Sequence, residues 1–126
     1  MRWLLDTNVV VWTLYKPDEL SAMVQDALHR RTVAACYSAA AIWELAIRQA
    51  SGKLPYRANR VARELERLGF VEIPITAHHG LAAGCLPRHH NDPFDRVMIA
   101  QALAEDLVLV SRDHLFVRYG VRLLQT

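Results

Sequence analysis

Four acidic residues are candidates for chemistry: three stand where an apolar run ends or a helix begins, and the fourth lies within an apolar helix. They are Asp6, Glu44, Asp95 and Asp113. Two like charges 4 Å apart repel by roughly 4 kcal/mol at an effective dielectric constant of 20, so carboxylates that share a pocket need protonation or a cation. An all-oxygen ligand set favours a hard divalent ion such as Mg²⁺ or Mn²⁺. Such a site is typical of phosphoryl chemistry, in which the ion activates water and stabilises charge on the phosphate.

Each of these acids also has a structural interpretation, which the sequence leaves open. Asp6 could cap the helix that follows it, and Asp113 could cap the turn after it. Glu44 is the single charged residue in an otherwise apolar stretch of helix, which indicates burial against a partner or a metal. It could equally pair with Arg48, because glutamate four residues before arginine is the favourable order, worth roughly 0.2–0.5 kcal/mol.

The segment that carries Asp95 has a clear start. Asp92 suits the N-cap of a helix, and Pro93 suits the first helical position, where its missing N–H costs nothing. An apolar run at 107–110 follows this helix and stops before Asp113. Such a run is typical of a strand buried on both faces.

Apolar runs alternate with helical patterns along the whole chain. We predict strands over 1–5, 32–37, 70–73, 107–110 and 121–124, and helices over 9–14, 22–30, 39–50, 58–68 and 93–105, with short helical turns after 76 and over 114–117. Helices that alternate with fully apolar strands predict an α/β fold with a parallel sheet covered on both sides. Ligands of such sheets bind at the carboxyl ends of the strands. We therefore expect the four acids to meet at one edge of the sheet.

Composition indicates one globular domain over residues 1–126, with 52% hydrophobic and 22% charged residues. A net charge of +2 does not by itself indicate a protein that binds nucleic acid. The two cysteines, Cys36 and Cys85, lack metal-ligand spacing and suggest a reduced, cytoplasmic setting. Because Asp6 interrupts the first apolar run, we expect neither a signal peptide nor a membrane span.

Histidine, arginine and tryptophan carry weaker signals. The pairs at 78–79 and 89–90 have no chelating spacing, so we expect no histidine-bound metal and no special role for His90 beyond a contact with RNA. The arginines at 57, 60, 63 and 67 form a stripe on one helix, which we interpret as a solvated face, with phosphate contact or partner docking as the alternative. The tryptophans, Trp43 among them, are predicted to lie in the core.

Taken together, the motifs resemble the PIN domain, and more narrowly a VapC-type toxin of a bacterial type II toxin–antitoxin pair. The resemblance covers essentially the whole chain. It is carried by Asp6-Thr7-Asn8, by the segment from Ser38 to Leu45, by His90-Asn91-Asp92-Pro93-Phe94-Asp95-Arg96, and by Val110-Ser111-Arg112-Asp113. It implies a three-layer α/β/α, PIN-like fold with a central, mostly parallel sheet of about five strands.

The resemblance also implies an activity, endonucleolytic cleavage of RNA by a metal-activated water. Asp6, Glu44, Asp95 and Asp113 are then the acids that hold one or two Mg²⁺ or Mn²⁺ ions. Thr7, Asn8, Asp92 and Ser111 are accessory residues, and Arg96 and Arg112, which flank the acids, are expected to hold the RNA backbone. The implied partners are a second copy of the chain and a small antitoxin, with DNA reached only through that antitoxin. Ser111 stands where threonine is common, a minor departure from the pattern.

Three rival functions can be weighed on the residues. A phosphatase of the HAD type needs Asp-x-Asp after the first strand, but the second position here is Asn8. A phosphorelay receiver needs a lysine late in the sheet, and neither Lys16 nor Lys53 can fill that place. A catalytically silent PIN-fold binding module, which docks a protein partner, has no reason to keep four unpaired acids at one edge. Metal-dependent cleavage of RNA separates that module from an enzyme.

Overall fold

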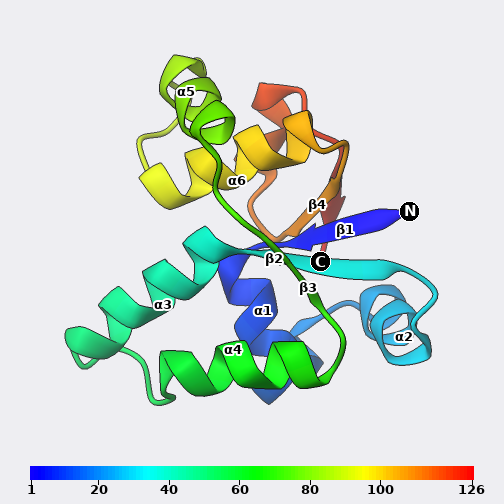
Figure 1. Ribbon diagram of the computed structural model, residues 1–126. Coiled ribbons are helices and arrows are strands. Elements are labelled where there is room, and N and C mark those ends of the chain that lie inside the picture. Colours follow the sequence, from blue (N-terminus) through cyan, green and yellow to red (C-terminus); the bar gives the residue numbers. More distant parts are fainter.

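The computed structural model describes residues 1–126 and contains one five-stranded sheet in the order β3-β2-β1-β4-β5 (Figure 1). All four neighbouring pairs of strands are parallel, where the resemblance implied a mostly parallel sheet. The strands are β1 (Arg2–Leu5), β2 (Ala34–Ser38), β3 (Val71–Ile73), β4 (Val108–Ser111) and β5 (Leu123–Gln125). The predicted strands are therefore confirmed to within about two residues at each end.

Helices connect the strands and cover both faces of the sheet. They are α1 (Thr7–Tyr15), α2 (Ala22–Arg30), α3 (Ala39–Ala50), α4 (Ala58–Arg67), α5 (Ala77–Cys85) and α6 (Pro93–Ala104), with 3₁₀ helices η1 (Pro17–Glu19) and η2 (His114–Tyr119). The first helix begins two residues earlier than predicted because Asp6 caps it directly. None of these helices has the length and apolar character needed to cross a membrane.

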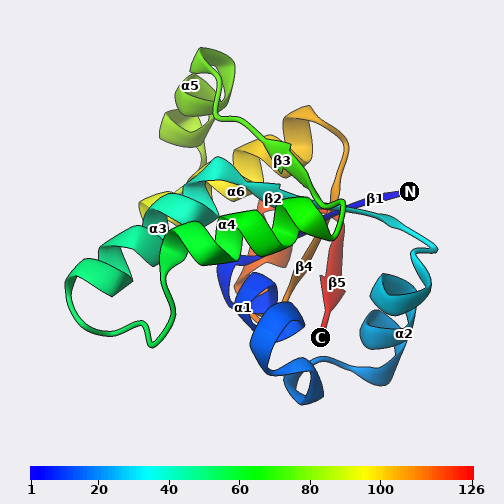
Figure 2. The same cartoon turned by 60° about the horizontal axis from the view of Figure 1, so that its bottom comes forward.

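Two separate apolar cores flank the sheet, which makes the α/β/α layering explicit. Along β1, Trp3 and Leu5 belong to one core and Leu4 to the other, because successive strand side chains point to opposite faces. The first core includes residues of α1 to α4, and the second includes residues of α6 and η2. In Figures 1 and 2, α5 and α6 accordingly lie on the opposite side of the strands from α1 and α2.

The strand order contains the reversal that creates a binding crevice. From β1 the chain proceeds outward to β2 and β3, then crosses back so that β4 and β5 extend the other edge. The carboxyl ends of β1 and β4 are hydrogen-bonded neighbours at this switch point. Open α/β sheets bind their ligands at such a point. Asp6 follows β1 directly, and Asp113 lies two residues beyond β4.

Helix α3 is less buried than its apolar sequence predicts. The side chain of Trp43 is 60% exposed and that of Ile47 is 47% exposed, so the prediction of a core position for Trp43 is wrong. Trp43 meets Phe94 of α6 edge-on, with ring centroids 5.0 Å apart. An apolar residue pattern indicates how much of a helix can be buried, but it does not say whether a neighbouring element is present to cover each face.

Candidate active site

Asp6 is held by residues from both central strands. Its Oδ1 accepts a hydrogen bond from the backbone N–H of Thr7 at 2.7 Å, and its Oδ2 accepts one from the hydroxyl of Ser111 at 2.7 Å. The Ser111 oxygen in turn accepts the backbone N–H of Asp113 at 3.1 Å. One fully buried hydroxyl therefore links the acid after β1 to the acid after β4.

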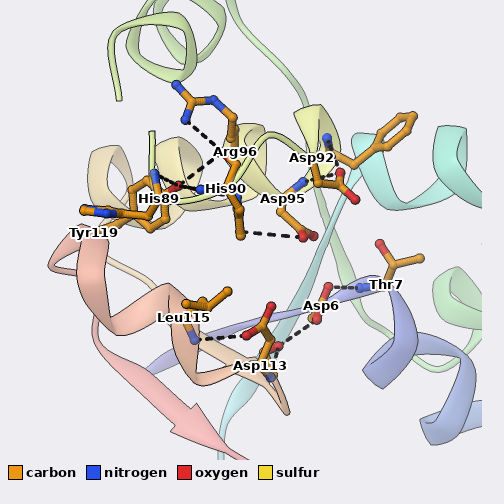
Figure 3. Close-up of polar contacts among 12 residues, drawn as sticks. Asp6, Thr7, His89, His90, Asp92, Asp95, Arg96, Asp113, Leu115 and Tyr119 are labelled. Carbon is orange, nitrogen blue, oxygen red and sulfur yellow. Dashed lines mark hydrogen bonds and ion pairs between the residues drawn. The ribbon is translucent and has the colours of Figure 1, made fainter. Parts of the chain in front are cut away.

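Asp95 occupies the first turn of α6 and its carboxylate is left free. Asp92 caps the helix, accepting the backbone N–H groups of Phe94 at 2.9 Å and of Asp95 at 3.2 Å. The predicted capping role of Asp92 is therefore confirmed. No hydrogen bond or arginine reaches the Asp95 carboxylate; the one titratable base beside it is His90, whose Nε2 lies 3.8 Å from Oδ2. Figure 3 shows the side chains of Asp95, Asp6 and Asp113 directed toward a common space.

Burial and the neighbouring acids raise the pKa values of Asp95 and Asp6. Burial, followed by the charges of Asp6, Asp92, Glu44 and Asp113, raises the pKa of Asp95 from 3.8 to about 8. Burial also raises the pKa of Asp6, with smaller contributions from Glu44 and Asp113, against the lowering effect of its hydrogen bonds. Both effects have the same physical cause, since ionised carboxylates lack solvent and countercharge at this edge.

Glu44 reaches the site from α3, and the predicted pairing with Arg48 is confirmed, whereas a role in metal binding stays a prediction. Its Oε1 accepts the hydroxyl of Thr7 at 2.7 Å, which brings it beside Asp6. Its Oε2 pairs with Arg48 at 2.8 Å, and Arg48 also donates to the side chain of Asn8 at 3.1 Å. Glu44 is thus the one member of the four with an arginine partner, and its side chain is 14% exposed.

His90 is the site residue that the sequence reasoning missed. One ligand atom each from His90, Asp95 and Asp113 lie within 4.8 Å of one another. The sequence favoured an all-oxygen ligand set, and the structure places the imidazole of His90 beside it. The sequence did offer one signal for His90, its position two residues before the N-cap of α6. The loop that leads into a helix lies at the same edge of the sheet as the start of that helix.

The donor set fits a hard divalent cation. Carboxylates of three elements surround one space, none of Asp6, Asp95 and Asp113 pairs with lysine or arginine, and the pKa of Asp95 is raised to about 8 by burial and the neighbouring acids while no countercharge reaches it. A divalent ion supplies that charge through oxygen ligands.

The two arginines expected to contact RNA are engaged within the protein. Arg96 donates to the backbone oxygens of four residues in the segment before α6: Ala83, Leu86, Pro87 and His90. Arg112 stacks over Trp12 at 4.1 Å from the ring centroid, pairs with Glu19 at 3.2 Å and donates to the backbone oxygen of Thr126. Both guanidinium groups thus stabilise the fold, and contact with RNA stays a prediction.

The remaining candidates lie outside the acidic cluster. His79 forms a capping box with Thr76 at the start of α5 and bonds Glu105 at 3.0 Å, whereas His78 is exposed. The arginine stripe of α4 is exposed, and Arg67 pairs with Glu64 at 2.9 Å. This arrangement agrees with a solvated face.

The PIN-domain family model matches residues 3–121. The chain therefore belongs to the PIN-domain family, whose members are in general nucleases that use divalent metal ions.

Three solved structures are similar in fold over nearly the whole chain. VapBC2 from Rickettsia felis, bound to a DNA fragment from its promoter, gives a TM-score of 0.71 at 18% identity, covering 99% of this chain and 98% of that chain. DNA-bound VapBC from Salmonella typhimurium gives a TM-score of 0.71 at 16% identity, covering 99% of this chain and 98% of that chain. FitAcB from Neisseria gonorrhoeae gives a TM-score of 0.66 at 19% identity, covering 98% of this chain and 96% of that chain. No curated protein matches the sequence.

Proposed function

We propose that this protein is a metal-dependent endoribonuclease that acts as the toxin of a bacterial toxin–antitoxin pair. The observation that carries the proposal is the crowding around Asp95. Its carboxyl group lies among four other acids at the switch point of the sheet, and its pKa is raised to about 8. A fold stabilised only by packing gains nothing from this arrangement, whereas a site for a divalent ion and a phosphodiester requires it.

Asp6, Asp95, Asp113 and Glu44 are the residues proposed to hold Mg²⁺ or Mn²⁺. Such an ion, when bound, neutralises phosphate charge and lowers the pKa of water at the site. The chain's own contribution is orientation. The hydroxyl of Ser111 and the backbone N–H of Thr7 orient the Asp6 carboxylate. Asp92 caps the N-terminus of α6, so the carboxylate of Asp95 is not used for capping.

The proposed partners follow from the solved structures that are similar in fold. VapBC2 from Rickettsia felis, VapBC from Salmonella typhimurium and FitAB are bound to DNA in these structures, and a further similar structure is a toxin–antitoxin complex from Klebsiella pneumoniae. For this chain we propose a cognate antitoxin that covers the acidic edge, a homodimer, and contact with promoter DNA only through the antitoxin. The cytoplasmic setting suggested by the cysteines also stays a prediction.

Incubation of the purified chain, free of antitoxin, with a mixed pool of RNA tests this function. Parallel samples contain Mg²⁺, Mn²⁺ or a chelator, and single-stranded DNA of the same sequences replaces RNA in a second set. We expect RNA fragments only with metal and none from Asp95→Asn. Cleavage of DNA alone would reject the RNA assignment, and no cleavage of either would favour the silent binding module.

A further inference from the structure

The nitrogen Nε2 of His90 is buried among the acids without a hydrogen-bond partner. The side chain is 15% exposed, but this atom has no access to solvent. It lies 3.8 Å from Oδ2 of Asp95, too far for a hydrogen bond yet within reach of a small turn of that carboxylate. A buried polar nitrogen without a partner is costly, so its retention at this place needs a reason.

The other ring nitrogen of His90, Nδ1, decides which form of the imidazole faces the acids. The hydroxyl oxygen of Tyr119 accepts two backbone N–H groups, from His89 at 3.1 Å and from His90 at 2.9 Å. These two bonds occupy both lone pairs of the oxygen, so the hydroxyl must donate its own proton elsewhere. Nδ1 of His90 is the nearest acceptor, at 3.4 Å, and the backbone oxygen of His90 is the next, at 3.5 Å.

A proton donated to Nδ1 leaves the neutral ring with its own proton on Nε2. Nε2 then faces Asp95 as a donor. Direct coordination of an ion by Nε2 would require the opposite tautomer, with Nδ1–H directed at an oxygen whose lone pairs are already used. Phe116, which meets the imidazole edge-on at 5.6 Å, and Tyr119, which is buried, also hold the ring in place.

From this geometry we propose that His90 is a positioning residue that donates its Nε2–H to Asp95. The bond would fix one carboxylate oxygen and leave the other available to hold the proposed ion, with Tyr119 setting the tautomer. The inference rests on the proposed metal site but not on the substrate. It adds a histidine to a site that the sequence describes as purely acidic, in the role that partners of metal ligands commonly take.

Nuclear magnetic resonance of the ¹⁵N-labelled protein tests the tautomer directly. Long-range ¹H–¹⁵N correlations of the His90 ring are recorded at pH 8, first without metal and then with Mg²⁺, which is diamagnetic. We expect the proton on Nε2 in both samples. A proton on Nδ1 alone in the metal-free protein, or loss of the Nε2 proton when Mg²⁺ binds, would overturn the proposal, the second result in favour of direct coordination.

Variants test the same bond through ion affinity. His90→Phe keeps the ring but removes the donor, and we expect Mn²⁺ binding, measured by calorimetry, to weaken about tenfold. His90→Gln keeps an N–H near the same place, and its affinity should stay within about threefold of the parent value. His78→Asn, which changes an exposed histidine of α5, is the control. The unfolding temperature of metal-free His90→Phe should change little, because Nε2 has no partner there and the Tyr119 hydroxyl, which loses Nδ1, can donate to the backbone oxygen of residue 90 instead.

Binding of Mn²⁺ to His90→Phe with the parent affinity would reject the positioning role while leaving the nuclease proposal intact. Conversely, a protein that binds Mn²⁺ through a His90-dependent site but cleaves no RNA would reject the nuclease proposal and retain this one.

Discussion

The hydroxyl of Ser111 donates to Oδ2 of Asp6 over 2.7 Å and thereby ties the end of β4 to the end of β1. The two residues are 105 positions apart in the chain, and their contact spans the switch point of the sheet. Because the same oxygen accepts the N–H of Asp113, the bond also sets the path of the chain to the second acid.

Loss of this hydroxyl should weaken ion binding. In Ser111→Ala, Asp6 loses a hydrogen bond that lowers its pKa and orients its carboxylate. We expect about tenfold weaker Mn²⁺ affinity by calorimetry, the loss that partners of metal ligands typically cause. Ser111→Thr keeps the hydroxyl and serves as the matched control. Equal affinity in the alanine variant would mean that the backbone alone orients Asp6.

Asp95→Asn should separate stability from activity. The amide cannot ionise, so we expect the variant to lose the proposed RNA cleavage and toxicity while it stays folded in the parent's oligomeric state. If Asp95→Asn cut RNA at the parent rate, the assignment of Asp95 would be wrong.

The same variant tests the raised pKa through the pH dependence of stability. Between the ordinary pKa of 3.8 and the folded value of about 8, the unfolded chain is ionised at Asp95 and the folded chain is protonated. The contribution of Asp95 to the free energy of unfolding is therefore full below about pH 4 and is lost as the pH rises to about 8. At pH 8, metal-free Asp95→Asn should be more stable than the parent by on the order of 1–3 kcal/mol. Denaturant unfolding at pH 5 and pH 8 measures this difference, and an equal loss in both proteins would contradict it.

Substitutions of Glu44 and Arg48 test whether Glu44 binds the ion or serves only as the ion-pair partner of Arg48. If its carboxylate contributes to the ion site, Glu44→Gln should weaken Mn²⁺ binding several-fold, roughly in line with loss of one acidic ligand or its partner. In Arg48→Met, Glu44 loses its neutralising partner, so ion affinity should rise. Unchanged affinity in Glu44→Gln would return Glu44 to a purely structural pairing with Arg48 on α3.

Arg96→Lys tests whether Arg96 acts within the fold or on the substrate. Lysine keeps the charge but cannot reproduce bonds to four carbonyls, so we expect a loss of about 2 kcal/mol in the free energy of unfolding. Arg63→Lys on the exposed face of α4 is the control. Parent stability together with weakened RNA binding would instead support the predicted contact between Arg96 and RNA.

The sheet and the four acids could be predicted because local signals are strong there. Strands buried on both faces are continuous apolar runs, and Ser38 and Asp92 mark helix starts by their capping chemistry. Parallel strand order then sends Asp6 and Asp113 to one edge. These inferences need only short windows of sequence and one topological rule.

The features that escaped prediction depend on contacts between distant segments. The place of His90 is set by Tyr119, which is 29 positions away and carries no motif. In the sequence Arg96 resembles a free cation, but the end of α5 and the segment after it surround its guanidinium group. Trp43 is exposed because no other element of the chain covers that face of α3, and helical periodicity cannot report this.

Titration calorimetry of Mg²⁺ or Mn²⁺ into the metal-free protein tests the central claim most directly. Measurements at pH 7 in two buffers of different ionisation enthalpy give the number of protons released per ion. Because the pKa of Asp95 is about 8, binding should release roughly one proton or more at pH 7, less above pH 9, and about one fewer in Asp95→Asn. No binding, or binding without proton release at pH 7, would contradict the claim that these acids form a site for a divalent ion.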